Sequence, residues 1–396
     1  MLTFRRAIYI AAVLIAVFFL LHSTHRSATR ITNADELPKP QPVDSQTFRH
    51  KEEPPKAKLV EKPVDKPVDK PVAPMTTQVE PLTPVKKKPQ TQLPLADLRR
   101  QPLRQQLAYQ FPYDVENKFP AYIWQTWKTT PASGDFEEEF REGEASWSIL
   151  HPSFVHEVIT DSVAVPLLRH LYSSIPEVLE AYNALPMPVL KADFFRYLIL
   201  LARGGIYSDI DTAAIKSAIE WVPADVPRNS YGMVIGIEAD PDREDWQLWY
   251  SRRIQFCQWT IQAKPGHPVL RDIVANITEE TLMRKKQGRL PKDTHDIVEF
   301  TGPALWTDTV FRFFNDPEYF DMANSKGNIT WKHFTGIKSA KKVGDVIVLP
   351  ITSFSPGVKQ MGAGEDDDPM AFVKHRFEGE SPSLVAQNSK ESLHTW

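Results

Sequence analysis

An uninterrupted apolar run, Ala7–Leu21, lies near the N-terminus and follows Arg5 and Arg6. At about 1.5 Å per residue, a helix of this length spans about 22 Å, which is short for a hydrocarbon core of about 30 Å. The run is either a cleaved signal peptide or an uncleaved signal-anchor. No small-x-small cleavage site follows it, so the pattern favours an anchor over residues 1–22 with a cytosolic N-terminus. Short spans are typical of the early secretory pathway, which predicts a single-pass type II protein of the Golgi membrane or endoplasmic reticulum.

Residues 23–115 lack apolar periodicity, and 14 of the 34 prolines fall between Pro38 and Pro102. Such a composition cannot build a core and predicts an extended, disordered stem. The stem would hold the next domain away from the membrane. A ligand for proline-binding modules is the alternative, and a lumenal location favours the spacer.

From residue 116 to residue 380, short apolar runs alternate with segments of helical periodicity, whereas residues 381–396 show neither pattern. Strands alternating with helices are typical of an α/β domain with a mostly parallel sheet, which binds its ligands beyond the carboxyl ends of the strands. The expected strands are 119–127, 154–161, 206–211, 231–238 and 343–350, and the expected helices are 164–184 and 190–203.

Composition narrows the classes of function. The net charge of −3 argues against general nucleic-acid binding, which needs a strongly basic surface. A single cysteine, Cys257, excludes an intramolecular disulfide but not an oxidising compartment. Asn276 and Asn328 each begin an Asn-Ile-Thr sequon, a weak indication of glycosylation that agrees with a lumenal domain.

The expected strand 206–211 contains two acids, Asp209 and Asp211. Because side chains alternate along a strand, both acids would lie on one face, about 7 Å apart at their backbones. Like charges at that separation need a cation or hydrogen-bond donors between them. Oxygen ligands favour Mg²⁺ or Mn²⁺ over zinc, and such an ion usually completes its shell with substrate phosphates and water. A solvated strand end is the ordinary alternative.

The helix before this strand has a buried stripe at helical spacing and ends at Gly204 and Gly205, as a left-handed C-terminal cap would. Asp193 and Arg196 are three residues apart and share one side of that helix. Spacing alone favours a local salt bridge, and a pair that reaches a ligand across the strand ends is the alternative.

The segment Leu190–Thr212 resembles the corresponding segment of glycosyltransferase family 32, and several further blocks resemble that family in the same order from about Phe119 to about Gly379. Separated blocks in one order are more specific than any single motif. The further blocks are Ile123–Lys128, Thr301–Asp308, Ser353–Gly357 and Phe372–Gly379.

The resemblance implies a GT-A type, Rossmann-like fold and GDP-mannose as the donor. It also implies a divalent ion, Mn²⁺ or Mg²⁺, that bridges Asp211 and the diphosphate, while Asp209 faces the ribose and the metal. His375 would close the site as a further metal or phosphate ligand. On this basis Asp209 and Asp211 are also the expected catalytic residues.

The donor sugar would be held by Asp193 and Arg196, the base would pack near Trp124, and Gly302 would contribute to donor binding. The family retains anomeric configuration, which needs a carboxylate nucleophile or a front-side route. Glu238 and Asp240 are candidates for the nucleophile by position only, and solvated acids are the simpler interpretation of both. The same holds for the acidic run 365–368.

One departure from the family lies at the C-terminal end. The family ends in His-x-x-x-Gly-Ser-Trp, and here the tryptophan expected after Gly379 is missing. The leading hypothesis is a lumenal mannosyltransferase that extends an N-linked high-mannose glycan in α-1,6 linkage. Another acceptor, such as a sphingolipid, and a non-catalytic role beside other Golgi mannosyltransferase subunits are the alternatives.

Overall fold

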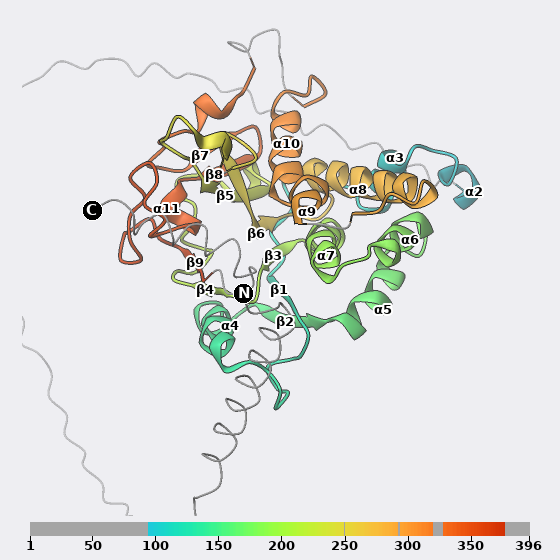
Figure 1. Cartoon of the computed structure of the whole chain (residues 1–396), viewed down its shortest axis with the longest axis horizontal. Helices are drawn as coiled ribbons and strands as arrows, with labels where there is room; N and C mark the ends of the chain where they lie inside the picture. The colour runs from blue at the N-terminus through green and yellow to red at the C-terminus, as the bar shows by residue number, and fades with distance from the viewer. Residues whose placement is uncertain (1–93, 249, 292–293, 320–327, 377–396) are drawn as a thin grey trace, which may run out of the picture. The chain divides into compact units, whose positions relative to one another are not determined.

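Seven strands form one mixed sheet in the order β2-β1-β3-β6-β5-β8-β7, in a computed structural model that describes residues 94–248, 250–291, 294–319 and 328–376 (Figure 1). Five strands share one direction, because β2, β1 and β3 are parallel, β5 and β8 are parallel, and β6 runs antiparallel to both β3 and β5. The expected mostly parallel α/β sheet is therefore confirmed. The strands are β1 (Tyr122–Trp127), β2 (Val155–Thr160), β3 (Gly205–Ser208), β5 (Met233–Ala239), β6 (Gln255–Ala263), β7 (Lys341–Val343) and β8 (Val346–Leu349).

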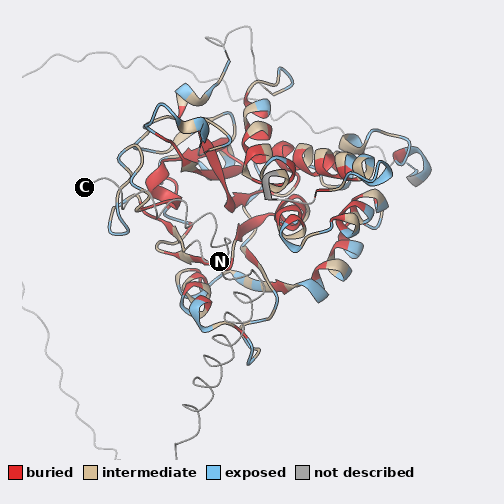
Figure 2. Ribbon diagram, viewed as in Figure 1, coloured by how far each residue is buried: buried red, intermediate tan, exposed pale blue. Residues whose placement is uncertain are grey.

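Helices cover both faces of the sheet, and alternate residues of the strands enter two different cores (Figure 2). Ile123 and Ile206 join the core on the side of α4, whereas their neighbours Trp124 and Tyr207 join the core on the side of α7. This period of two is what a central strand buried on both faces requires. The principal helices are α4 (Glu138–Leu150), α5 (Asp161–Leu171), α6 (Pro176–Ala184), α7 (Pro188–Arg203), α8 (Pro268–Lys286), α9 (Thr294–Phe300), α10 (Pro303–Phe314) and α11 (Ile351–Phe354).

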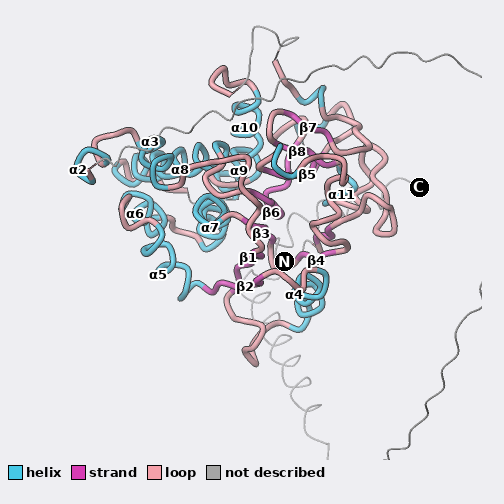
Figure 3. Tube along the Cα trace, turned by 180° about the vertical axis from the view of Figure 1, so that it is seen from behind, coloured by secondary structure: helices cyan, strands magenta, loops and turns pink. Residues whose placement is uncertain are grey.

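The helix α7 lies at the centre of the helical layer and is buried along most of its length (Figure 3). Leu190, Phe194, Leu198 and Leu201 are all 0% exposed, which confirms the stripe expected from their spacing. Pro188 in the first turn needs no hydrogen-bond partner for its nitrogen, so it favours the start of the helix at this point.

A small two-stranded sheet, β4 (Thr212–Ala214) and β9 (Val373–His375), lies beside α4 and α11. The two strands are antiparallel, and Thr212 pairs with His375. This pairing joins the middle of the described chain to its C-terminal end.

Three expectations from the sequence are corrected. The predicted helix 164–184 is two helices, α5 and α6, separated at residues 172–175. The C-terminal part of the predicted stem over 23–115 contains two helices, α2 (Leu95–Leu98) and α3 (Leu103–Gln110). It packs onto the globular domain, since Leu107 of α3 is 0% exposed within the main core. The predicted strand 206–211 ends at Ser208, so Asp209 and Asp211 lie in the turn that follows it.

The predicted anchor over residues 1–22 and the predicted tail over 381–396 lie outside the described residues. Within the described part of the chain, no helix combines the length and the apolar character that a membrane span needs. Of the two sequons, Asn328 is exposed, whereas Asn276 is half-buried in α8 and its Thr278 is fully buried. Glycosylation at both positions stays a prediction.

Candidate functional site

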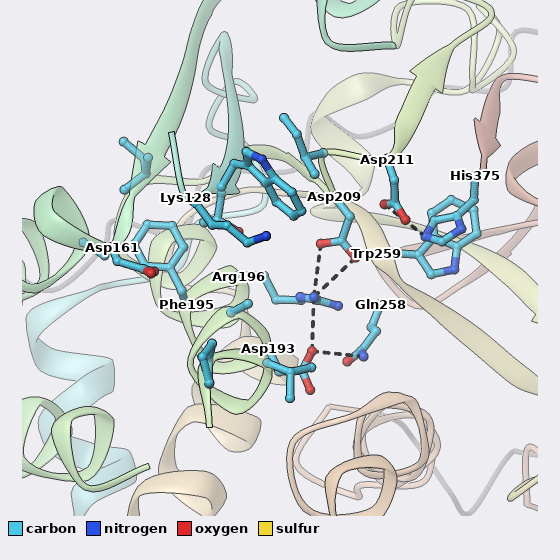
Figure 4. A pocket seen from close by; sticks show the side chains of 18 of the residues that line it. Lys128, Asp161, Asp193, Phe195, Arg196, Asp209, Asp211, Gln258, Trp259 and His375 are labelled. Atoms are coloured by element: carbon cyan, nitrogen blue, oxygen red, sulfur yellow. Dashed lines mark hydrogen bonds and ion pairs between the residues drawn. The ribbon is translucent and has the colours of Figure 1, made fainter. Parts of the chain in front are cut away.

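A cavity of about 410 Å³ opens at the carboxyl ends of the parallel strands β2, β1 and β3 (Figure 4). Asp161 follows β2, Lys128 follows β1 and Asp209 follows β3, and all three line the cavity. Ligands of open α/β sheets bind at this edge because the strand ends and helix starts present polar groups there. The expected location of the site is therefore the location of the cavity.

Two glycines turn the chain sharply from α7 into β3. Gly204 has φ of +64° and Gly205 has φ of +98°, which side chains with a Cβ rarely adopt. A Cβ at Gly205 would lie 2.6 Å from the carbonyl oxygen of Tyr122 on β1. Glycine at this point therefore lets β3 pair closely with β1, and so fixes where the acids after β3 emerge.

The turn that carries the two acids is held by hydrogen bonds to the backbone of Asp209. The Gln125 side chain of β1 donates to the carbonyl oxygen of Asp209 (3.0 Å), and the Asp209 amide donates to the carbonyl oxygen of Trp259 on β6 (2.9 Å). The Thr212 hydroxyl also donates to the carbonyl oxygen of Asp209 (2.6 Å). Hydrogen bonds from β1 and β6, the two strands beside β3, thus fix the backbone of the turn. The Asp209 side chain stays 24% exposed.

The pairing of β4 with β9 brings His375 next to the two acids, although it is more than 160 positions away from them in the sequence. His375 Nε2 lies 3.4 Å from Asp211 Oδ1, and the ring packs against Trp259. Ligand atoms of Asp209, Asp211 and His375 all lie within 4.8 Å of one another. Opposite ligands of a Mg²⁺-sized octahedral ion are about 4.2 Å apart, so the three side chains fit a divalent ion with little movement.

Burial has a large effect on the imidazole at this position. It lowers the pKa of His375 from 6.5 to about 4, against the opposing influence of Asp209. The ring is therefore neutral near pH 7, which is the form that ligates a metal. The expected grouping of these three residues is confirmed in geometry, and metal binding by them stays a prediction.

A buried ion network connects α7 to this turn. Arg196 Nη2 lies 3.1 Å from Asp193 Oδ1 and 3.1 Å from Asp209 Oδ1 (Figure 4). The Asp193 carboxylate also accepts hydrogen bonds from the Thr301 hydroxyl (2.8 Å) and from Gln258 (3.3 Å). Burial raises the pKa of Asp193 and of Asp209, and the guanidinium of Arg196 opposes that rise in both. Asp193 and Arg196 therefore form more than a local salt bridge, since Arg196 also contacts Asp209 in the turn after β3.

Arg196 has unsatisfied hydrogen-bond donors. Its Nε and Nη1 atoms are buried and have no hydrogen-bond partner among the described residues. A buried guanidinium normally satisfies its five donors, because each unsatisfied donor costs free energy. Since Arg196 lines the cavity, an anionic or hydroxyl-bearing ligand there would supply the missing acceptors.

Two of the expected donor-binding residues lie elsewhere. Trp124 is 8% exposed in the core, where its indole donates to the carbonyl oxygen of Gly204 (2.9 Å), and Trp127 of the same strand lines the cavity instead. Gly302 is buried at the start of α10, and a Cβ there would lie 2.8 Å from the Cα of Val298. Gly302 thus permits the close approach of α9 and α10.

The two acids considered as nucleophiles differ in the structure. Asp240 is 1% exposed and accepts from the Thr335 hydroxyl (2.8 Å) and the Gly336 amide (2.7 Å), so it holds a loop. Glu238, two residues earlier on β5, lines the cavity. In the acidic run, Asp366 pairs with Lys374 and does not line the cavity.

The cavity also contains residues to which the sequence assigned no role. They lie at or just after the ends of β1 and β2, or on the helices α4, α6 and α7, so the rule that ligands bind at strand ends was the available signal for the first group only. These residues are Trp127, Lys128, Phe140, Ile159, Asp161, Tyr182 and Phe195.

Comparison with known proteins identifies the family. Residues 137–227 match the family described as "Glycosyltransferase sugar-binding region containing DXD motif". The "Initiation-specific alpha-1,6-mannosyltransferase" of Candida albicans is 49% identical over 70% of this chain and 76% of its own length. The protein with that name in Saccharomyces cerevisiae is 35% identical over 70% of this chain and 81% of its own length.

A third relative, the "Putative glycosyltransferase HOC1" of Saccharomyces cerevisiae, is 42% identical over 66% of this chain and 66% of its own length. The matched segment 137–227 contains α7, the double glycine turn, and the acids Asp209 and Asp211 in the turn after β3. The chain therefore belongs to the DXD-containing glycosyltransferases of family 32, among the relatives of the fungal initiation-specific α-1,6-mannosyltransferases.

Proposed function

We propose that this protein transfers mannose from GDP-mannose to an N-linked high-mannose glycan in α-1,6 linkage, with retention of configuration and with a bound Mn²⁺ or Mg²⁺ ion. One observation carries the proposal. The acids Asp209 and Asp211, the imidazole of His375 and the buried Asp193–Arg196 pair meet in a single cavity at the strand ends. The names of the relatives support mannose transfer and the linkage.

In this proposal Asp209, Asp211 and His375 hold the divalent ion. When bound, the ion would supply Lewis-acid stabilisation of the charge that builds on the leaving diphosphate. Lys128, which extends over the cavity between Asp161 and Asp209, adds a second positive charge at the same place (Figure 4). Preorganised charges of this kind stabilise a transition state without rearranging when the reaction occurs.

The donor sugar is positioned by the network on α7. Arg196 offers the Nε and Nη1 donors that lack partners, and Asp193, fixed by Thr301 and Gln258, keeps the guanidinium in place. Glu238 is a carboxylate on β5, two strands from β3, which puts it about 10 Å from Asp209 along the sheet. In this proposal Glu238 is the carboxylate that acts on the anomeric carbon, because it lines the cavity while Asp240 is buried away from it.

The proposed cellular setting rests on the sequence. The apolar run at residues 7–21 and the proline-rich segment after it suit a type II Golgi membrane protein whose catalytic domain is lumenal. The GDP-mannose donor and the N-glycan acceptor both suit that compartment. A non-catalytic role in a complex with other Golgi mannosyltransferase subunits is the second candidate, because the family's C-terminal tryptophan is missing after Gly379.

The test uses the full chain, purified in detergent and incubated with GDP-mannose, Mn²⁺ and a high-mannose glycan. We expect a product one hexose larger, with an α-1,6-linked mannose by mass spectrometry and linkage analysis. Changing Asp209 and Asp211 together to asparagine should lower turnover by at least about 1,000-fold, since it removes two of the three metal ligands. Asp225→Asn, a change at an exposed acid away from the cavity, is the matched control.

Two results would contradict the proposal. Transfer that persists in the double variant would refute the metal assignment. A wild-type chain that is folded and binds GDP but transfers nothing to glycan or lipid acceptors would favour the non-catalytic role.

A further inference from the structure

The cavity has a second end, which differs from the metal end in its chemistry. Apolar side chains line much of the cavity, and they come from two separate hydrophobic clusters. Ile159, Tyr182 and Phe195 belong to the core on the side of α7, whereas Trp127 and Phe140 belong to a small cluster that includes Ile210. A slot between two apolar walls is suited to a flat ring, because stacking and burial of apolar surface both stabilise one there.

One carboxylate lies at this apolar end. Asp161 is the first residue of α5, directly after β2, and it lines the cavity. Figure 4 shows it beside Phe195, at the opposite side of the cavity from Asp211 and His375, with Arg196 between them. Five carboxylates line the cavity, and the other four are Asp193, Asp209, Asp211 and Glu238. The other four lie on α7, after β3 and on β5, whereas Asp161 alone follows β2.

The sheet sets the separation between the two ends. β2 is two strands from β3 in the sheet order, and neighbouring strands are about 4.8 Å apart. Asp161 therefore lies about 10 Å along the sheet edge from the acids after β3. With a diphosphate at the metal end, that separation leaves room for a ribose and places the base at the apolar end. Lys128 follows β1, the strand between them.

The chemistry of a carboxylate selects among the bases. An ionised carboxylate only accepts hydrogen bonds. Guanine presents two neighbouring donors on one edge, N1–H and the 2-amino group, and a carboxylate can accept both. Uracil presents a single N3–H between two carbonyl oxygens, and adenine presents an acceptor, N1, beside its amino group, so both edges place a lone pair against the carboxylate.

Together, these observations lead to one assignment. We infer that Asp161 reads the guanine of the donor nucleotide through N1–H and the 2-amino group, and so makes the site specific for a guanosine diphosphate-sugar. This inference rests on the proposed function and extends it from the transferred sugar to the base. The competing explanation is that Asp161 only stabilises α5, because the helix dipole favours an acid in the first turn. That role would give no selectivity among bases.

The experiment measures equilibrium binding of GDP, IDP and UDP to the full-length protein with Mn²⁺, by titration calorimetry. IDP lacks only the 2-amino group of guanine. We expect the wild-type protein to bind GDP at least about tenfold more tightly than IDP, since a hydrogen bond to a charged group contributes about 1.5–3 kcal/mol and 1.4 kcal/mol is a factor of ten. UDP should bind more weakly than IDP.

The variant Asp161→Asn should bind GDP about 10- to 100-fold more weakly and should no longer distinguish GDP from IDP. Its affinity for UDP should stay within about twofold of wild type, because the metal end is unchanged. Glu157→Gln, at an exposed acid of β2, is the matched control and should leave all three affinities unchanged. A helix-dipole role predicts a lower melting temperature with the same GDP to IDP ratio.

The outcomes separate the two proposals. A variant that keeps the wild-type GDP to IDP ratio would overturn the role of Asp161 and leave the transferase proposal intact. A wild-type protein that prefers UDP to GDP would overturn both the guanine assignment and GDP-mannose as the donor. Wild-type selectivity that is lost only in Asp161→Asn would establish the assignment, whether or not glycan transfer is observed.

Discussion

The two ends of the cavity are built in different ways. At the metal end, Asp193, Arg196 and Asp209 come from one short segment of chain and form a buried ion network. At the apolar end, Trp127, Asp161 and Phe195 come from β1, α5 and α7, three separate elements of the fold. A cavity can thus combine an ion network whose residues are close in the sequence with apolar side chains that come together only in the folded chain.

The two ends should therefore differ in how much stability a substitution removes. Buried charges are costly if a partner is removed, whereas an apolar wall tolerates a similar hydrophobic side chain. Arg196 and Phe195 are consecutive residues of the same helix, and both line the cavity. They offer a direct comparison of the two ends at one position along the chain.

The largest expected effect comes from Arg196→Met. Removing the guanidinium leaves Asp193 buried without its ionic partner, so we expect the free energy of unfolding to fall by about 3 kcal/mol, the lower part of the range for broken buried pairs. Phe195→Leu should cost about 1 kcal/mol, because it conserves apolar character. Urea denaturation without nucleotide measures both. Equal losses in the two variants would contradict the contrast between the ends.

A smaller and purely kinetic effect is expected from Glu238→Gln. This carboxylate lines the cavity on the far side of the metal end from Asp161, so its loss should lower kcat about 100-fold while the affinity for GDP stays unchanged. Steady-state kinetics with GDP-mannose and a glycan acceptor measure this separation. Glu365→Gln, in the exposed acidic run, is the control. A loss of GDP affinity equal to the loss of kcat would instead place Glu238 at the nucleotide.

The smallest effect concerns acid conditions. His156 of β2 bonds Gln125, which holds the Asp209 carbonyl, and burial lowers the pKa of His156 from 6.5 to about 4. Below pH 6.5 the unfolded chain binds a proton that the folded chain does not, so stability falls as the pH falls toward 4. We expect this histidine to account for a loss of about 2 kcal/mol between pH 7 and pH 5.

Several charged and polar groups face His156, and they bear on this test. They are Glu144, 3.6 Å from its Nδ1, and the neighbouring Ser148 and His151. His156→Gln keeps a polar side chain and removes the titration, so its stability should fall less steeply over the same pH range in denaturation experiments. Identical pH profiles for the variant and the wild type would show that another group titrates.

Sequence patterns indicated that Asp193, Arg196, Asp209 and Asp211 lie near one another, because these residues are close together in the chain. The stripe on α7, the two positive-φ glycines and the spacing of Asp193, Arg196, Asp209 and Asp211 are all local features. The strand assignment over 206–211 was wrong at its end, since Gln125 and Trp259 hold the chain in a turn after Ser208. The grouping of His375 with the acids came from the family resemblance and not from any spacing.

The apolar end could not be predicted in the same way. Trp124 was the expected aromatic residue, but alternation along β1 places it in the core and leaves Trp127 at the cavity. Which of several tryptophans faces a ligand depends on where a strand ends, and a pattern of apolar residues does not determine that boundary. Asp161 looked like the end of a strand and is the start of α5.

By itself, the sequence determined the α/β class, the helix–glycine–acid segment and the family, because each depends on residues that are near one another or on blocks in a fixed order. Only the tertiary structure decided that His375 lies beside Asp211, that Asp240 holds a loop while Glu238 lines the cavity, and that Asp161 lies among aromatic side chains. These positions depend on the strand order β2-β1-β3-β6-β5 and on the pairing of β4 with β9. Non-local pairing is a property of the whole folded chain, and no local spacing encodes it.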